Sequence, residues 1–319
     1  MKNRILGKTG LKVSELALGG LFVSKFGGDL QQSKNTVRRA VELGVNYIDT
    51  APTYADSEVV LGPAMEGISE PLILSTKLGG RPTPFNPKDK DCLRKSVEMS
   101  LKALKRDTID ILFVHEPERT EVYDWWTDSE RFTGPVTEVM EELKREGVIK
   151  YTGLAGTTAY KMARLIKNGN FDVVLTAFNY CLLWREAEHE VLPAAKEKKM
   201  GIVIGSPLQQ GSLAKRWDDK VRNGAPWLNL PRRKQLIALY DFLDEINISL
   251  PELAIRWVIS NPDISCVLMG AKSPQEVEMN VESIAKGPLP KDIRKKADEI
   301  AAMVPFRPAE ENATINFNL

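Results

Sequence analysis

The sequence has little of what crosslinks a fold or holds a metal ion. Its three cysteines, Cys92, Cys181 and Cys266, lie far apart and form no CxxC pair. This spacing argues against a disulfide framework and a zinc site, so we expect no metal and a reducing compartment. An excess of charge of one sign is also missing, because 44 Lys and Arg residues stand against 43 Asp and Glu. No overall field therefore attracts nucleic acid or an anionic membrane.

Long apolar runs are missing as well. No stretch approaches the roughly 20 residues that span a bilayer, and the basic residues near the N-terminus have no apolar segment behind them. We therefore expect a cytoplasmic protein without a membrane partner. The hydrophobic share of 43% and the charged share of 27% are those of a soluble globular chain with a sizeable core.

Short apolar runs alternate with amphipathic stretches along the chain, which is the pattern of repeated βα units around a parallel sheet. The predicted strands lie near residues 15–19, 45–49, 72–76, 109–114, 149–154, 172–177, 201–205 and 264–269. The predicted helices lie near residues 33–43, 55–66, 88–105, 135–146, 158–168, 186–199, 231–246, 250–260 and 274–285. Eight repeats without a GxGxxG turn after the first strand favour a closed barrel over a Rossmann sheet.

We therefore expect an α/β chain that forms one (β/α)8 TIM barrel over residues 1–319, with a C-terminal tail at about 304–319. Long loops near residues 82–90, 116–133 and 206–230 all follow predicted strands. In such a barrel the loops after the strands build the active-site face. Their length thus predicts substrate pockets rather than joints between domains.

Ionisable residues stand at the ends of three consecutive predicted strands, namely Asp49, Lys77 and His115. Barrel geometry brings these ends to one rim, and Tyr54 follows Asp49 closely enough to join them. A Lys77 ammonium beside Tyr54 would lower the pKa of that tyrosine, while Asp49 would keep Lys77 charged. Tyr54 would then serve as acid and base. His115 would donate a hydrogen bond to a carbonyl oxygen as negative charge develops there, or it would help to relay the proton.

Each of these residues also has a plainer explanation when it is taken alone. Asp49 suits a strand-end turn or cap, and Lys77 suits a solvated strand end. His115 suits a structural histidine, and Tyr54 a half-buried aromatic residue. The joint placement favours the catalytic interpretation, because ionisable residues without a common function would otherwise have to fall by chance at the same rim.

Several segments resemble the aldo-keto reductase superfamily, and in particular its sugar (aldose or galactose) dehydrogenase branch. Three segments are specific to this family when they occur together, namely residues 44–54, 74–77 and 110–115. Residues 147–153, 206–208 and 270–280 support the resemblance. The resemblance, which runs from about residue 4 to 285, implies a (β/α)8 barrel that moves hydride between NAD(P) and a carbonyl or alcohol. It also implies a catalytic tetrad at Asp49, Tyr54, Lys77 and His115.

The resemblance further implies that NAD(P) binds in an extended form without a Rossmann domain. The expected contacts are Gly20, Asn179, Ser206, Pro207, Leu208, Gly270, Lys272, Glu276 and Asn280. Many members hold the nicotinamide amide with Ser-Asn and Gln, where this chain has Ala155, Gly156 and Leu175. Thr176 or Asn179 would have to take over that contact. An aromatic residue that often stacks on the nicotinamide is replaced here by Gly205.

At the adenosine end, members that favour NADP commonly have an arginine where this chain has Glu276. A carboxylate repels a 2′-phosphate and accepts a hydrogen bond from a ribose 2′-hydroxyl, so we favour NAD. Lys272 is close enough in sequence to bind a phosphate, which keeps NADP open. Ser273 and Pro274 also predict a capped helix start at this point.

Aromatic residues in the loops and the tail are candidates for the wall of a substrate pocket, and they equally suit local cores. They are Phe22, Trp125, Trp126, Trp227, Phe306 and Phe317. Residues 206–214 resemble sugar dehydrogenases, so a sugar is a plausible substrate and an aldehyde is equally admissible. Two other functions stay open, namely a cofactor-binding regulatory subunit with the same barrel and a hydrolase or lyase that uses no nucleotide.

Overall fold

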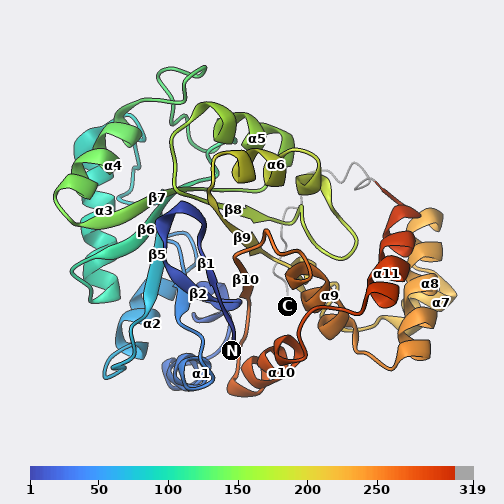
Figure 1. Ribbon diagram of the computed structural model, residues 1–319. Coiled ribbons are helices and arrows are strands. Elements are labelled where there is room, and N and C mark those ends of the chain that lie inside the picture. Colours follow the sequence, from blue (N-terminus) through green and yellow to red (C-terminus); the bar gives the residue numbers. More distant parts are fainter. Residues whose placement is uncertain (306–319) are drawn as a thin grey trace.

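Eight parallel strands close into a barrel in the computed structural model, which describes residues 1–305 (Figure 1). The strands follow one another around the barrel in chain order, and β10 closes it by pairing with both β9 and β3. They are β3 (Leu16–Gly19), β4 (Tyr47–Asp49), β5 (Ile73–Leu78), β6 (Ile109–His115), β7 (Ile149–Gly156), β8 (Val173–Ala177), β9 (Gly201–Gly205) and β10 (Cys266–Met269). The predicted (β/α)8 fold is confirmed, and every predicted strand overlaps an observed one.

Helices cover the outside of the barrel (Figure 1). They are α1 (Leu30–Glu42), α2 (Ser57–Ala64), α3 (Lys90–Leu104), α4 (Pro135–Arg145), α5 (Ala159–Asn168), α6 (Val191–Glu197), α7 (Asp218–Asn223), α8 (Leu230–Ile246), α9 (Leu250–Ile259), α10 (Pro274–Ala285) and α11 (Lys291–Ala302). The sequence did not predict α7 or α11. Val221 is the one buried residue of the short α7, and alanines supply much of the buried face of α11, so neither shows a strong apolar period.

Apolar side chains fill the inside of the barrel and the layer between strands and helices. Tyr47, Phe113 and Val203 belong to the inner core, while alternate strand residues such as Ile48 and Leu112 pack outward against the helices. Strands that are buried on both faces read as continuous apolar runs, which explains why the sequence revealed them. The lumen is therefore packed with side chains and is not a pore.

A short hairpin covers the N-terminal end of the barrel and is drawn in dark blue in Figure 1. Its antiparallel strands are β1 (Asn3–Ile5) and β2 (Lys12–Ser14), too short to show a period in the sequence. Leu6 and Val13 insert fully buried side chains into the inner core. At Gly7, which has φ 48°, a Cβ would lie 2.2 Å from the Gly201 backbone nitrogen. Only glycine fits this contact.

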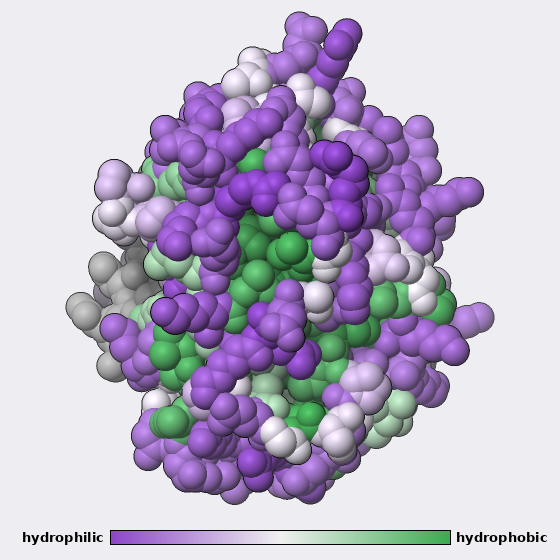
Figure 2. Space-filling view, turned by 90° about the vertical axis from the view of Figure 1, so that its left-hand side faces the viewer, coloured by the Kyte–Doolittle hydropathy of each residue, from purple (hydrophilic) through white to green (hydrophobic). Residues whose placement is uncertain are grey.

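The three long loops run from the other, C-terminal end, because each follows a barrel strand. Seen from the left-hand side of Figure 1, which is a flank of the barrel, the surface is mostly hydrophilic and hydrophobic residues gather near its middle (Figure 2). Within residues 1–305, none of the helices combines the length and the apolar character needed to cross a membrane. Of the predicted tail, residues 306–319 lie outside the described residues, and so do the candidates Phe306 and Phe317.

Candidate active site

The ends of β4, β5 and β6 bring the four predicted catalytic residues together. Asp49 and His115 are the last residues of β4 and β6, and Lys77 is the penultimate residue of β5 between them. The Lys77 Nζ donates to Asp49 Oδ2 over 2.7 Å, and both side chains are buried. The same ammonium lies 4.7 Å from the centroid of the Tyr54 ring. The Tyr54 and His115 rings meet edge to face with centroids 6.0 Å apart.

A hydrogen-bond chain holds the Asp49–Lys77 pair from inside the barrel. The Lys77 Nζ also donates to the Thr50 carbonyl oxygen at 2.7 Å. The Ser75 hydroxyl donates to Asp49 Oδ1 at 2.6 Å, and it lies 3.0 Å from the Tyr47 hydroxyl. Both carboxylate oxygens therefore have a donor, which a buried charge requires. Tyr47 and Ser75 are not apparent as site residues from their type, but the alternation of strand side chains puts both on the inner face that carries Asp49.

Burial and neighbouring charge act in opposite directions on Lys77 and Tyr54. Desolvation lowers the pKa of Lys77, but the attraction of Asp49 and Tyr54 outweighs it and the net pKa is raised. Burial is the largest effect on Tyr54 and raises its pKa, while Lys77 pulls that pKa down. The expected net lowering for Tyr54 is therefore not seen. Lys77 acts in the expected direction, but desolvation of the phenolate is stronger. Tyr54 is thus a protonated phenol held beside a cation.

His115 is neutral in this environment. Burial lowers its pKa to about 3, and the charges of Lys77 and Arg119 add to that shift. Its Nδ1 lies 3.4 Å from the Thr53 hydroxyl. A neutral imidazole carries one N–H donor and one acceptor nitrogen. His115 can therefore donate a hydrogen bond without bringing a second positive charge next to Lys77.

Small residues line the inner side of the rim next to this group. Ala155, Ala177 and Gly205 stand at or one residue before the ends of β7, β8 and β9. A Cβ added to Gly205 would lie 3.1 Å from the Ala177 Cβ. No side chain longer than a methyl group therefore projects from these three positions.

The two residues that we expected to replace the missing amide ligands bind each other. The Thr176 hydroxyl donates to Asn179 Oδ1 over 2.6 Å, and Asn179 Nδ2 donates to the Thr157 carbonyl oxygen over 3.2 Å. Both Thr176 and Asn179 are buried. They connect the end of β8 to the loop after β7. Leu175, where many members have Gln, belongs to the inner apolar core.

The other expected cofactor contacts follow β9, β10 and β3, which are neighbours around the barrel. Ser206, Pro207 and Leu208 come directly after β9. Gly270 and Lys272 follow β10, and Gly20 follows β3, where an added Cβ would lie 2.9 Å from the Asp49 carbonyl oxygen. The rim thus leads from β9 through β10 and β3 to β4, where the predicted catalytic group begins.

The predicted start of α10 is confirmed. Ser273 is its N-cap and accepts from the Glu276 backbone N–H, with Pro274 as the first helical residue. The Glu276 carboxylate accepts from the Lys272 backbone N–H at 2.8 Å. Asn280 Nδ2 donates to the Glu276 carbonyl oxygen at 2.8 Å. The side chain of Glu276 is exposed, so it can meet a ligand at the helix start.

The candidate pocket aromatics have different surroundings from those expected. The structure places Phe22 beside two of the expected cofactor residues. The centroid of its ring lies 5.0 Å from the Lys272 Nζ, and a Cβ added to Gly270 would lie 2.9 Å from a ring carbon of Phe22. Trp125 is 0% and Trp126 6% exposed, so both are interior residues of their loop and do not form an open wall. Trp227 is 64% exposed.

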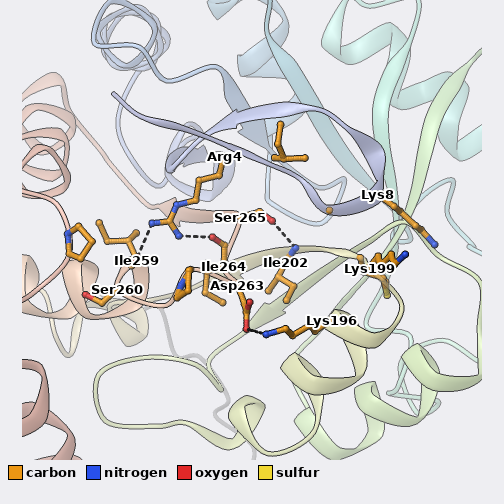
Figure 3. A pocket seen from close by; sticks show the side chains of 15 residues that line it. Arg4, Lys8, Lys196, Lys199, Ile202, Ile259, Ser260, Asp263, Ile264 and Ser265 are labelled. Atoms are coloured by element: carbon orange, nitrogen blue, oxygen red, sulfur yellow. Dashed lines mark hydrogen bonds and ion pairs between the residues drawn. The ribbon is translucent and has the colours of Figure 1, made fainter. Parts of the chain in front are cut away.

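A cavity of about 780 Å³ lies at the opposite end of the barrel, beneath the hairpin (Figure 3). Arg4 donates there to the carbonyl oxygens of Ile259 and Ile264, and Lys196 pairs with Asp263. Arg4 thus ties the hairpin, and Lys196 ties α6, to the segment between α9 and β10. Within the described residues, no group of three or more His, Cys, Asp or Glu is placed to hold a metal ion.

Comparison with known proteins gives a consistent set of relatives. The model of the Aldo/keto reductase family matches residues 16–302. The chain is 28% identical to the NADH-specific methylglyoxal reductase of Escherichia coli (strain K12), over 89% of this chain and 94% of the relative. It is 28% identical to the L-galactose dehydrogenase of Arabidopsis thaliana, over 89% and 88%. A solved holo-form aldo-keto reductase from Bacillus halodurans superposes with a TM-score of 0.78 at 27% identity, covering 96% of this chain and 98% of that one.

Proposed function

Because this chain belongs to the aldo/keto reductase family, we propose that it transfers hydride between NAD(P) and a carbonyl or alcohol substrate, with Tyr54 as the general acid or base. The observation that carries this proposal is the buried Lys77–Asp49 pair, whose ammonium lies 4.7 Å from the centroid of the Tyr54 ring. A phenol next to a fixed cation is a proton donor whose conjugate base is stabilised.

Each residue has a separate part in the reaction. In the reducing direction Tyr54 gives its proton to the carbonyl oxygen, and Lys77 stabilises the phenolate that remains. Asp49 keeps Lys77 charged and fixes its position. Neutral His115 donates a hydrogen bond to the same oxygen as negative charge develops on it. Bound NADH or NADPH supplies the hydride. In the oxidising direction the Tyr54 phenolate removes the proton of the alcohol.

The proposed cofactor path follows the rim from α10 to the catalytic group. Asn280 and Glu276 would meet the adenosine, and Lys272 and Gly270 the phosphates. The chain after β9 and Gly20 would border the nicotinamide end. Thr176 and Asn179 already bond to each other, so they contribute to this region as part of its wall. The exposed Glu276 carboxylate supports NAD over NADP, and a relative named as NADH-specific agrees with that preference.

The proposed substrate is a small aldehyde, ketone or sugar. One relative is named for methylglyoxal and another for L-galactose, so both a compact dicarbonyl and a polyol are supported. We further propose that the protein acts in the cytoplasm, which suits its three cysteines, because all are buried and none forms a disulfide in the part of the chain that the structure describes.

Two measurements test this proposal. Titration of the protein with NADH and with NADPH, followed by nicotinamide fluorescence, should give saturable binding with tighter binding of NADH. A panel of aldehydes and sugars, followed by nicotinamide absorbance, should then show turnover. Binding without turnover of any substrate would favour the regulatory subunit, and the absence of saturable binding would favour the hydrolase or lyase.

A further inference from the structure

Two adjacent tryptophans hold the backbone where β6 ends. The Trp125 Nε1–H donates to the His115 carbonyl oxygen at 3.1 Å, and the Trp126 Nε1–H donates to the Pro117 carbonyl oxygen at 2.9 Å. Both indoles are buried. A buried indole N–H needs a partner, so each of these bonds ties the later part of the loop back to the strand end.

Trp125 belongs to an aromatic cluster that we define as Phe85, Tyr123 and Trp125. Their ring centroids are 5.2 to 5.6 Å apart. The Tyr123 ring also covers Gly79, where an added Cβ would lie 3.1 Å from it. Phe85 and Gly79 lie in the loop after β5, whereas Tyr123 and Trp125 lie in the loop after β6. The aromatic cluster thus connects the loop that follows Lys77 to the loop that follows His115.

We propose that Trp125 is a positioning residue, which acts through its bond to the His115 carbonyl oxygen to aim the imidazole at the substrate. This inference rests on the proposed role of His115. The direction of a side chain at a strand end depends on its own backbone. On one side that backbone is fixed by β7, since the Glu116 N–H donates to the Ala155 carbonyl oxygen at 2.8 Å. The indole of Trp125 supplies a second attachment.

Trp126 is the matched comparison, because it makes the same kind of bond two residues farther along the chain. Its ring packs against Phe132 and Phe171, at 5.6 and 6.4 Å between centroids, and neither residue belongs to the aromatic cluster or to the proposed catalytic group. Loss of the Trp126 bond should therefore weaken the loop without turning the imidazole.

The test compares Trp125→Phe with Trp126→Phe, because phenylalanine keeps an aromatic ring and removes the N–H. His115 and His189 are the two histidines of the chain, so His189 serves as an internal reference in NMR spectra of the imidazoles. We expect Trp125→Phe to shift the His115 ring resonances at constant pH and to lower kcat roughly tenfold. NADH binding and the His189 signals should stay unchanged. Trp126→Phe should leave His115 and kcat as in the wild type.

Thermal unfolding of each variant shows whether it folds. If Trp125→Phe does not, Phe85→Leu loosens the packing of Trp125 while keeping its N–H, and it should move the His115 signals in the same direction by less. Unchanged His115 signals in the folded variant, or equal changes in both tryptophan variants, would overturn the proposal. The NMR result does not require turnover. A protein that is inactive throughout would therefore refute the proposed function, while the His115 signals would still decide whether Trp125 positions the imidazole.

Discussion

At the scale of single residues, the Lys77 ammonium is the group on which its neighbours depend. It bonds to Asp49 and to the Thr50 carbonyl oxygen, and it lies over the Tyr54 ring. Removal of one partner of a buried ion pair leaves an uncompensated charge, which costs about 3–5 kcal/mol. The same pair thus affects stability and the proposed proton transfer, and the two effects can be separated by mutation.

Lys77→Met should abolish most turnover and lower the free energy of unfolding by about 3–5 kcal/mol, because Asp49 loses its cation. The double variant Lys77→Met/Asp49→Asn removes both charges and should recover much of that stability without recovering turnover. Urea unfolding and steady-state rates measure the two effects. Full activity in the folded single variant would contradict the assigned role of Lys77.

The neutral state of His115 predicts a pH dependence of stability. Its pKa in the folded protein is lowered to about 3, whereas an unfolded histidine titrates near about 6.5. Between these values the unfolded state binds more protons, so this residue makes stability fall as the pH falls below about 6.5. His115→Asn should make the dependence shallower in that window when urea midpoints are compared. An unchanged or steeper dependence would mean that His115 is already protonated there.

Several of the decisive residues could be predicted from the sequence and others could not. Asp49, Lys77 and His115 end apolar runs, and parallel strands bring such ends to one rim. The net pKa of Tyr54 could not be foreseen, because it depends on burial by the whole rim. The burial of Trp125 could not be predicted either, because its neighbour Phe85 lies 40 positions earlier in the sequence and contacts it from another loop.

At the scale of elements, the two ends of the barrel have different roles, because the N-terminal end is closed by a packed hairpin and the C-terminal end carries the proposed catalytic group. Strands buried on both faces gave clear sequence patterns, whereas the hairpin of β1 and β2 has three residues per strand and gave none. The hairpin nevertheless fills the N-terminal end with Leu6 and Val13. The proposed catalytic group lies at the other end, so we expect the two ends to respond to mutation independently.

Leu6→Ala should lower the free energy of unfolding by about 2–5 kcal/mol, as expected for a fully buried leucine. It should leave kcat and cofactor binding close to the wild-type values. Urea unfolding and steady-state kinetics at a temperature where both proteins are folded provide the comparison. A large loss of kcat in the folded variant would show that the two ends are coupled.

At the scale of the whole molecule, the rim divides into two adjoining parts. The expected cofactor residues follow β9, β10 and β3, and the proposed catalytic group lies at the ends of β4, β5 and β6. The closed sheet makes these six strand ends contiguous, although β3 and β10 lie at opposite ends of the sequence. Eight repeats in the sequence were enough to predict that closure. The bond between Thr176 and Asn179 required coordinates, because it depends on side-chain placement after β8.

Glu276→Arg should shift cofactor preference towards NADPH, because it replaces a carboxylate with a cation at the start of α10. Glu282→Arg makes the same charge change at an exposed position of the same helix and should leave the preference unaltered. The ratio of the NADPH and NADH dissociation constants measures the effect. An unchanged or opposite preference in Glu276→Arg would show that this residue does not face the adenosine ribose.

The most direct test of the account follows bound NADH in a single turnover with an aldehyde that the wild type accepts. Tyr54→Phe removes the proton donor and keeps the ring, and Tyr160→Phe makes the same change at a residue that is 66% exposed. Tyr54→Phe should bind NADH as the wild type does and oxidise it at least about 100-fold more slowly, whereas Tyr160→Phe should match the wild type. Equal rates in the wild type and Tyr54→Phe would contradict the central claim.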